Sequence, residues 1–289
     1  MSAVEFPMYQ DHFGLKKPPF RITPDTHLFF EGCDRGVILQ ALCYAIQNGE
    51  GITKVVGEVG SGKTMLCRML PHSLDKRIDW VYLAHPRLEP DQMLQELARE
   101  LDIPLTLNSD KLTVMRELQT SLLKHHSQNR HVVVLVEEAQ EMPLETLEEL
   151  RLLSNLETDD HKLLQIVLFG QPELDENLAG RKIRQLRERI THSVYLDPLQ
   201  LPDIVAYMNF RMRACGYEGP ELFNEELAEA VQTFSHGLIR RINILGDKAL
   251  LAAFASGRKT VEIGDVQLAA RDSQYTTNRW WTLTEALHS

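Results

Sequence analysis

The run Gly57-Glu58-Val59-Gly60-Ser61-Gly62-Lys63-Thr64 decides the fold of this chain, because it matches the pattern G-x-x-x-x-G-K-[ST] at every fixed position. Residues 52–56 (ITKVV) predict a short strand that enters the run, and residues 65–70 predict a helix that leaves it. Glycine lets the backbone curl so that successive N–H groups face an anion, while the helix N-terminus adds the positive end of a dipole. The alternative is a glycine-rich turn without a ligand. The flanking strand and helix favour a phosphate loop.

Two side chains of this loop have the chemistry that a bound nucleotide needs. Lys63 can reach the β- and γ-phosphates, and the Thr64 hydroxyl can join the coordination shell of Mg²⁺. We therefore expect ATP or ADP together with Mg²⁺. The predicted nucleotide-binding residues are those of the loop and the residue that follows it, namely Gly57, Glu58, Val59, Gly60, Ser61, Gly62, Lys63, Thr64 and Met65.

Two acidic residues follow a second predicted strand. Residues 131–136 (HVVVLV) form a continuous apolar run typical of a central parallel strand buried on both faces, and Glu137 and Glu138 come directly after it. In P-loop enzymes an acid at this place holds Mg²⁺, so Glu137 and Thr64 are the predicted metal ligands. Glu138 is predicted to point to the other side of the strand end and to polarise the attacking water. Buried acids without a function would be costly at such a position.

A glutamine and two arginine-bearing segments complete the candidate site. Residues 163–169 predict another buried strand that leads to Gln171, whose amide is placed to bond the γ-phosphate or the attacking water. The alternative for Gln171 is an ordinary loop amide. Residues 181–189 are dense in positive charge, and Arg240-Arg241 begins a predicted helix. These arginines are either a solvated basic surface or a source of charge for the transition state of phosphoryl transfer.

The order of the predicted elements indicates the fold class and the domains. Strands alternate with helices as far as residue 197, which predicts an α/β, doubly wound, mostly parallel sheet with its ligand at the carboxyl ends of the strands. Strand patterns then stop, and an all-helical domain is expected. The predicted strands are 52–56, 80–84, 131–136, 163–169 and 191–196, and the helices of the second domain are 202–214, 224–234, 238–256 and 265–273. The predicted domains are a wrapping segment at 1–30, the α/β domain at 31–197, the helical domain at 198–273 and a tail at 274–289.

Some local expectations accompany these elements. Residues 1–30 are rich in aromatic residues and prolines, so they are expected to wrap over a core or to line the pocket for the nucleotide base. Ser109 and Asn224 are the expected N-caps of two helices, because both residue types accept a hydrogen bond from the first turn.

Composition and charge exclude several classes of protein. The chain has 289 residues with a net charge of −10, which argues against a general nucleic-acid coat or a binder of anionic membranes but permits a local basic face. Its four cysteines lie far apart and form no C-x-x-C pair, so reduced thiols are expected. No signal peptide and no apolar run of about 20 residues is present. We expect a cytoplasmic protein that reaches the inner membrane only through partners.

Several longer motifs resemble one family. The motifs are LVEEAQ at 135–140, LEELRLLSNLET at 147–158, FGQPEL at 169–174, LRERI at 186–190 and GLIRRIN at 237–243, besides the phosphate loop. They resemble the ExeA/GspA-type AAA+ ATPases of bacterial secretion and pilus assembly, and the resemblance runs from about residue 9 to about residue 271. Within that family the chain is most similar to the short ATPases of type IV (MSHA-like) pilus biogenesis.

The resemblance implies a fold and a role for each candidate residue. The fold is that of an AAA+ P-loop NTPase with a C-terminal helical lid. Glu137 falls at the Walker B metal acid, Glu138 at the water-activating glutamate and Gln171 at the sensor 1 position. Arg189 falls at the arginine finger, which acts on the ATP of a neighbouring subunit, with Arg187 as a second candidate, and Arg240 at the sensor 2 arginine.

The resemblance also implies partners, and one residue departs from the family pattern. Self-association through the arginine-finger face is expected, together with pilus or secretion assembly proteins, some at the inner membrane. The family normally has Asp where Glu137 stands, and the additional methylene shifts the carboxylate relative to the near-ideal octahedral shell that Mg²⁺ requires. Slow hydrolysis is therefore one expectation. Two alternatives stay open: a DNA-associated AAA+ regulator similar to transposition ATPases, and a nucleotide-gated scaffold with little hydrolysis.

Overall fold

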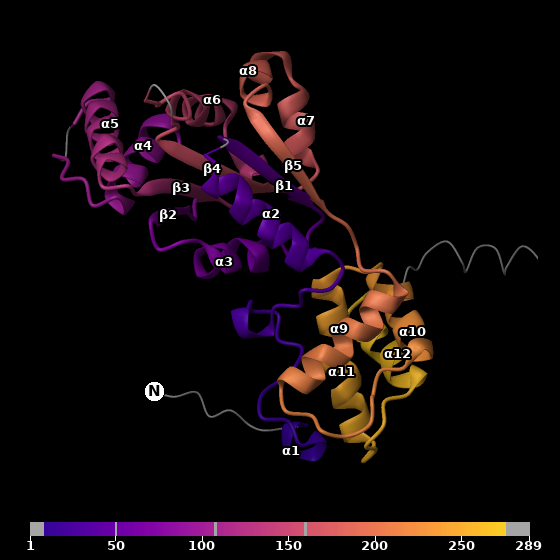
Figure 1. Ribbon diagram of the computed structural model, residues 1–289. Coiled ribbons are helices and arrows are strands. Elements are labelled where there is room, and N and C mark those ends of the chain that lie inside the picture. The colour runs from indigo at the N-terminus through magenta and orange to yellow at the C-terminus, as the bar shows by residue number, and fades with distance from the viewer. Residues whose placement is uncertain (1–8, 50, 107–108, 159–160, 276–289) are drawn as a thin grey trace, which may run out of the picture. The chain divides into compact units, whose positions relative to one another are not determined.

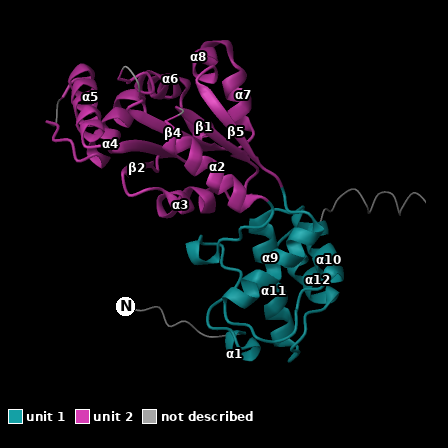
Figure 2. Cartoon of the chain, viewed as in Figure 1, with its two compact units in different colours: residues 1–33, 198–289 teal, residues 34–197 magenta. Residues whose placement is uncertain are grey.

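The computed structural model describes residues 9–49, 51–106, 109–158 and 161–275, and the chain forms two compact units (Figure 2). Residues 34–197 make up what we call the sheet unit. The helical unit combines residues 1–33 with residues 198–289. Each unit has its own cluster of buried apolar side chains.

The sheet unit is built on five parallel strands in the order β2-β3-β4-β1-β5 (Figure 1). Each predicted strand is present, with bounds that differ by at most two residues from those expected. The strands are β1 (Ile52–Gly57), β2 (Ile78–Leu83), β3 (His131–Val136), β4 (Leu164–Gly170) and β5 (Ile190–Leu196). Because β4 lies between β3 and β1, the residues that follow these three strands come together at one edge of the sheet.

Helices cover both faces of this sheet (Figure 1). Helices α2 and α3 pack on one face, whereas α4, α5 and α6 pack on the other, together with α7 and α8. Their bounds are α2 (Arg35–Gln47), α3 (Lys63–Ser73), α4 (Pro90–Glu100), α5 (Lys111–Ser127), α6 (Leu144–Leu153), α7 (Glu173–Ala179) and α8 (Arg184–Arg187), with 3₁₀ turns η2 (Ala139–Glu141) and η3 (Arg181–Ile183). The N-cap of α5 is Asp110, whose carboxylate accepts a hydrogen bond from the N–H of Thr113, so the expected cap Ser109 is wrong.

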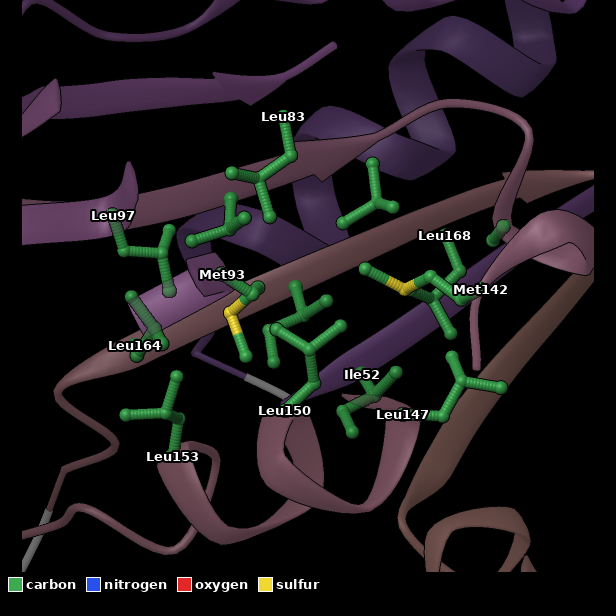
Figure 3. Packing of buried hydrophobic residues seen from close by; sticks show 14 of the residues in the cluster. Ile52, Leu83, Met93, Leu97, Met142, Leu147, Leu150, Leu153, Leu164 and Leu168 are labelled. Atoms are coloured by element: carbon green, nitrogen blue, oxygen red, sulfur yellow. The ribbon is translucent and has the colours of Figure 1, made fainter. Parts of the chain in front are cut away.

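The core of the sheet unit lies between the strands and helices α4 to α6 (Figure 3). Leu147, Leu150 and Leu153 line one side of α6 at helical spacing and meet Ile52 and Leu164 of the strands. All seven residues of β4 are buried, as its uninterrupted apolar sequence requires of a strand covered on both faces. This core fixes the strand ends on which the candidate site depends.

The helical unit contains the four predicted helices. They are α9 (Leu201–Ala214), α10 (Glu225–Ser235), α11 (Ile239–Ala255) and α12 (Ile263–Asp272), preceded in sequence by α1 (Gln10–Phe13) and a 3₁₀ turn η1 (Thr26–Leu28). Asn224 caps α10 as expected, because its side-chain oxygen accepts a hydrogen bond from the N–H of Leu227. The prediction of an α/β, doubly wound sheet followed by a helical part is confirmed.

The N-terminal residues belong to the helical unit. Phe20 and Leu28 are buried in the same apolar cluster as residues of α9 to α12. Arg211 of α9 is only 3% exposed, and its guanidinium donates hydrogen bonds to the carbonyl oxygens of Pro19 at 2.6 Å and Arg21 at 3.3 Å. Pro19 and Arg21 lie outside the helices and strands, and an arginine about 190 residues along the chain hydrogen-bonds their carbonyls. The described residues 9–33 therefore share a unit with residues 198–275.

Among the residues that the structure describes, none of the helices combines the length and the apolar character that a membrane crossing requires.

Candidate functional site

The loop that follows β1 has the backbone that its sequence predicts. Gly60 and Gly62 have φ angles of 83° and 105°, in the left-handed region that glycine adopts without strain. At Gly57 an added Cβ would lie 2.6 Å from Oγ of Ser61, so a larger residue would not fit. Helix α3 begins at Lys63, within the loop, and the first N–H groups of a helix have no acceptor in the helix itself. Oγ of Ser61 is buried and has no partner among the described residues, as expected of a loop that receives an anionic ligand.

Lys63 lies folded against this loop. Its side chain is nearly buried, and Nζ donates hydrogen bonds to the carbonyl oxygens of Gly57 at 2.6 Å and Glu58 at 3.0 Å. Burial lowers the pKa of the Lys63 ammonium, and the nearby carboxylates, Glu138 foremost, offset part of that effect. A buried ammonium held only by neutral carbonyls gains from an approaching phosphate, which supplies the opposite charge.

Glu138 and Gln171 meet at the edge of the sheet beside the loop. One oxygen of Glu138, Oε2, accepts hydrogen bonds from the side-chain amides of Gln171 at 2.9 Å and Gln140 at 2.7 Å. Burial alone would raise the pKa of the Glu138 carboxyl, but these two bonds and the charge of Lys63 outweigh it, so the pKa lies below its usual value. Glu138 also has a left-handed backbone (φ 51°), which is uncommon for a residue other than glycine and concentrates at functional sites. Glu138 is thus an ionised carboxylate held in place by two amides.

Glu137 faces a different set of partners. Its Oε2 accepts a hydrogen bond of 2.7 Å from the hydroxyl of Tyr82, which lies near the end of the neighbouring strand β2. The Cys67 thiol on α3 lies near the same carboxyl, and burial together with the charge of Glu137 raises the pKa of that thiol. The second carboxylate oxygen, Oε1, is buried and has no hydrogen-bond partner among the described residues. Glu137 therefore faces α3, one turn beyond Thr64, with one oxygen available.

This arrangement fits the metal that the sequence predicts. A buried carboxylate oxygen without a partner is costly unless a cation or a donor reaches it. Within the part of the chain that the structure describes, no group of three or more His, Cys, Asp or Glu side chains is arranged to hold a metal ion. Mg²⁺ does not need such a group, because it is commonly bound by one or two protein oxygens, water and substrate phosphates. Glu137 and Thr64 would supply those protein oxygens here.

Arg189 does not lie at this end of the sheet. Arg189 is exposed and directly precedes β5, whose first residue Ile190 pairs with Ile52 at the start of β1. The phosphate loop begins at Gly57, at the opposite end of β1, which is about 17 Å away along the strand. Arg189 therefore lies far from the loop of its own chain. Arg240 is exposed in the first turn of α11 in the helical unit, so its relation to the loop stays a prediction.

Sequence reasoning did not find four residues that contact this site. They are Gln140, Tyr82, Cys67 and Arg35. Arg35, only 5% exposed, begins α2, and its Nη2 donates to the carbonyl oxygens of Asp197 at 2.6 Å and of Ser61 in the loop at 3.5 Å. Of these four, Gln140 could have been found from the sequence, because it lies in the motif that includes Glu137 and Glu138.

Comparisons with known proteins agree with this geometry. Residues 46–178 match the family model described as AAA domain. The chain is 38% identical over 263 residues to the general secretion pathway protein A of Aeromonas hydrophila. That match covers 91% of this chain and 48% of the relative, so the chain spans about half the length of that relative.

Solved structures show the same fold at low sequence identity. One is Cdc6p from Pyrobaculum aerophilum, with a TM-score of 0.64 and 16% identity, covering 86% of this chain and 71% of that one. Another is the ORC1 protein of Aeropyrum pernix in complex with DNA, with a TM-score of 0.63 and 16% identity, covering 89% of this chain and 69% of that one. At such identities the likeness shows the fold alone.

Proposed function

From the premise that this chain has the AAA+ P-loop NTPase fold, we propose that it binds ATP with Mg²⁺ and hydrolyses it to ADP and phosphate. We further propose that it is an ExeA/GspA-type ATPase whose nucleotide cycle drives or regulates assembly of a secretion apparatus or a type IV (MSHA-like) pilus. The similarity to the general secretion pathway protein A over 91% of the chain supports the second proposal.

One observation carries the catalytic proposal: Glu138 and Gln171 are hydrogen-bonded to each other at the edge of the sheet where the phosphate loop begins. An ionised carboxylate there can accept a proton from a water that attacks the γ-phosphate. The Gln171 amide fixes that carboxylate and can also donate to the water or the phosphate. Lys63 offsets the charge that develops on the phosphate oxygens.

Thr64 and Glu137 would hold Mg²⁺, and the metal would neutralise charge on the β- and γ-phosphates. The loop backbone and the N-terminus of α3 would orient the phosphates, with Met65 in the first turn of that helix. The exposed Arg189 supports a role in trans, because it lies at the far end of β5 from the loop of its own chain. Arg240, in the helical unit, would sense the nucleotide through the lid.

A substitution at Glu138 tests the proposed reaction. The variant Glu138→Gln keeps the shape of the side chain but removes the base, so we expect ATP affinity to change less than about threefold while hydrolysis falls at least about 10²-fold. Binding is measured by calorimetry and hydrolysis by phosphate release. A matched control is Glu141→Gln. Glu141 lies three residues after Glu138, and its exposed carboxylate pairs with Arg87. Hydrolysis by Glu138→Gln at the parental rate would remove Glu138 from the mechanism.

Two other functions have an observation in their favour. Exposed basic side chains gather in η3, in α8 and directly after α8, which suits a DNA-associated regulator; they are Arg181, Lys182, Arg184, Arg187 and Arg189. Glutamate at position 137, where the family normally has aspartate, suits a nucleotide-gated scaffold with little hydrolysis. Duplex DNA binding that weakens steeply with salt would support the regulator. Tight ATP binding without turnover by the unaltered chain would support the scaffold.

A further inference from the structure

We propose that Tyr82 is the positioning residue for the metal acid: its hydroxyl fixes one oxygen of Glu137 and thereby leaves the other oxygen for Mg²⁺ bound with ATP. This inference rests on the proposed function and adds a residue that none of the motifs contains. Tyr82 lies on β2, the strand at one edge of the sheet, whereas Glu137 follows β3, its neighbour. The register of the two parallel strands, with Tyr82 beside Leu135 and Leu83 beside Val136, brings the hydroxyl to the carboxyl.

The contacts of Glu137 divide its two oxygens into different roles. Oε2 accepts the Tyr82 hydroxyl at 2.7 Å, while Oε1 is buried and unbonded among the described residues. A long glutamate side chain has several rotamers, and a fixed hydrogen bond to one oxygen selects among them. Partners of this kind orient metal ligands in general, and their loss typically weakens metal binding by about 10–100-fold.

The hydroxyl can only donate this bond while it is protonated. Burial raises the pKa of Tyr82, and the hydrogen bond to Glu137 and the charge of its carboxylate raise it further. The 2.7 Å bond to Oε2 of Glu137 is thus one that the protonated Tyr82 hydroxyl donates.

The pairing also explains how glutamate can replace aspartate here. An aspartate carboxylate would lie about 1.5 Å nearer to the backbone, which is the length of one carbon–carbon bond. From there it would not keep a 2.7 Å bond to the Tyr82 hydroxyl without a movement of β2. Glu137 and Tyr82 thus form a coupled pair, in which the length of the acid matches the position of the hydroxyl.

A double-mutant cycle tests this coupling. Binding of a fluorescent ATP analogue is titrated with Mg²⁺ in the unaltered chain, Tyr82→Phe, Glu137→Asp and the double variant, and affinity without Mg²⁺ is measured in EDTA. We expect Tyr82→Phe to raise the half-effective Mg²⁺ concentration about tenfold and to leave the Mg²⁺-free affinity unchanged. In the Glu137→Asp background, Tyr82→Phe should shift the half-effective Mg²⁺ concentration less than about twofold.

The matched control is Tyr195→Phe, which removes another tyrosine hydroxyl bonded to a carboxylate, that of Asp175. Tyr195 lies on β5, the edge strand farthest from β2. It should leave the Mg²⁺ dependence unchanged. An unchanged or lowered half-effective Mg²⁺ concentration in Tyr82→Phe would overturn the inference, as would an equal shift in both backgrounds. If the unaltered chain shows no Mg²⁺-dependent binding of the analogue, the proposed function fails instead.

Discussion

Lys63 is the residue whose loss should affect nucleotide binding most. Its ammonium is buried in the loop and held by two carbonyls, so Lys63→Ala removes the fixed positive charge that a triphosphate would meet. We expect ATP affinity to fall about 10²-fold, since hydrogen bonds to charged groups are worth about 1.5–3 kcal/mol. Calorimetry measures the affinity. Lys54→Ala is the control, because Lys54 on β1 pairs with Asp175 away from the loop. Unchanged affinity in folded Lys63→Ala protein would contradict a phosphate loop.

Some residues of the candidate site belong to a sequence motif, whereas others are brought to the site only by the fold. The loop residues, Glu137, Glu138 and Gln171 could be proposed from the sequence, because each follows a predicted strand and parallel strands end at one edge. Tyr82 could not, since its contact with Glu137 depends on the order and register of β2 and β3. Arg35 could not either, because its partners Ser61 and Asp197 are distant in sequence.

At the scale of elements, the short helix α8 and the strand β5 place Arg189 on the surface, away from the loop of its own chain. If Arg189 acts on a neighbouring subunit, Arg189→Ala should bind ATP normally yet hydrolyse it slowly at any concentration. Mixing it with Glu138→Gln subunits should restore partial activity, because some interfaces then pair an intact Glu138 with an intact Arg189. Phosphate release from the mixture measures this.

Arg184→Ala is the matched control for that experiment, because Arg184 is exposed on α8, five residues before Arg189, and faces Glu188 at 3.8 Å. It should hydrolyse ATP at the parental rate. Normal turnover by Arg189→Ala, with lost affinity for duplex DNA and a shallower salt dependence, would assign Arg189 to a DNA-binding face instead.

Long elements were predictable and short ones were not. The buried strands have continuous apolar runs, and the helices of ten residues or more have apolar patterns of period 3.6 that extend far enough to be recognised. Helices α7 and α8 have seven and four residues, too few for a periodic signal. At the start of α5, Ser109 and Asp110 are adjacent residues of the types that cap helices, and only the backbone decides that Asp110 accepts the bond from Thr113.

At the scale of the whole molecule, Arg211 joins the two ends of the chain within the helical unit. Replacing it by methionine keeps an apolar stem of similar length but leaves the carbonyls of Pro19 and Arg21 without their donor. We expect the helical unit to lose about 3 kcal/mol of stability, the cost of removing a buried charged donor from its partners. Hydrogen–deuterium exchange of residues 9–33 and of α9 measures the loss.

Arg213→Met is the control for that measurement, because Arg213 is exposed on the same helix and bonds only the nearby carbonyl of Tyr217 among the contacts described for it. Its effect should stay within about 0.5 kcal/mol. Equal protection of residues 9–33 in both variants would show that apolar packing alone holds the segment. Sequence patterns did not reveal this attachment, because residues 1–30 have no period and their partners lie about 190 residues away.

The membership of residues 9–33 in the helical unit has a consequence for synthesis on the ribosome. The sheet unit has all its residues once position 197 has emerged, and it can fold while translation continues. Phe20 and Leu28 emerge first, yet α12 completes the cluster that covers them, and it ends at Asp272. At about 5–20 residues per second, these early apolar side chains stay uncovered for many seconds. The cluster around Phe20 and Leu28 can therefore close only after nearly all of the chain has been made.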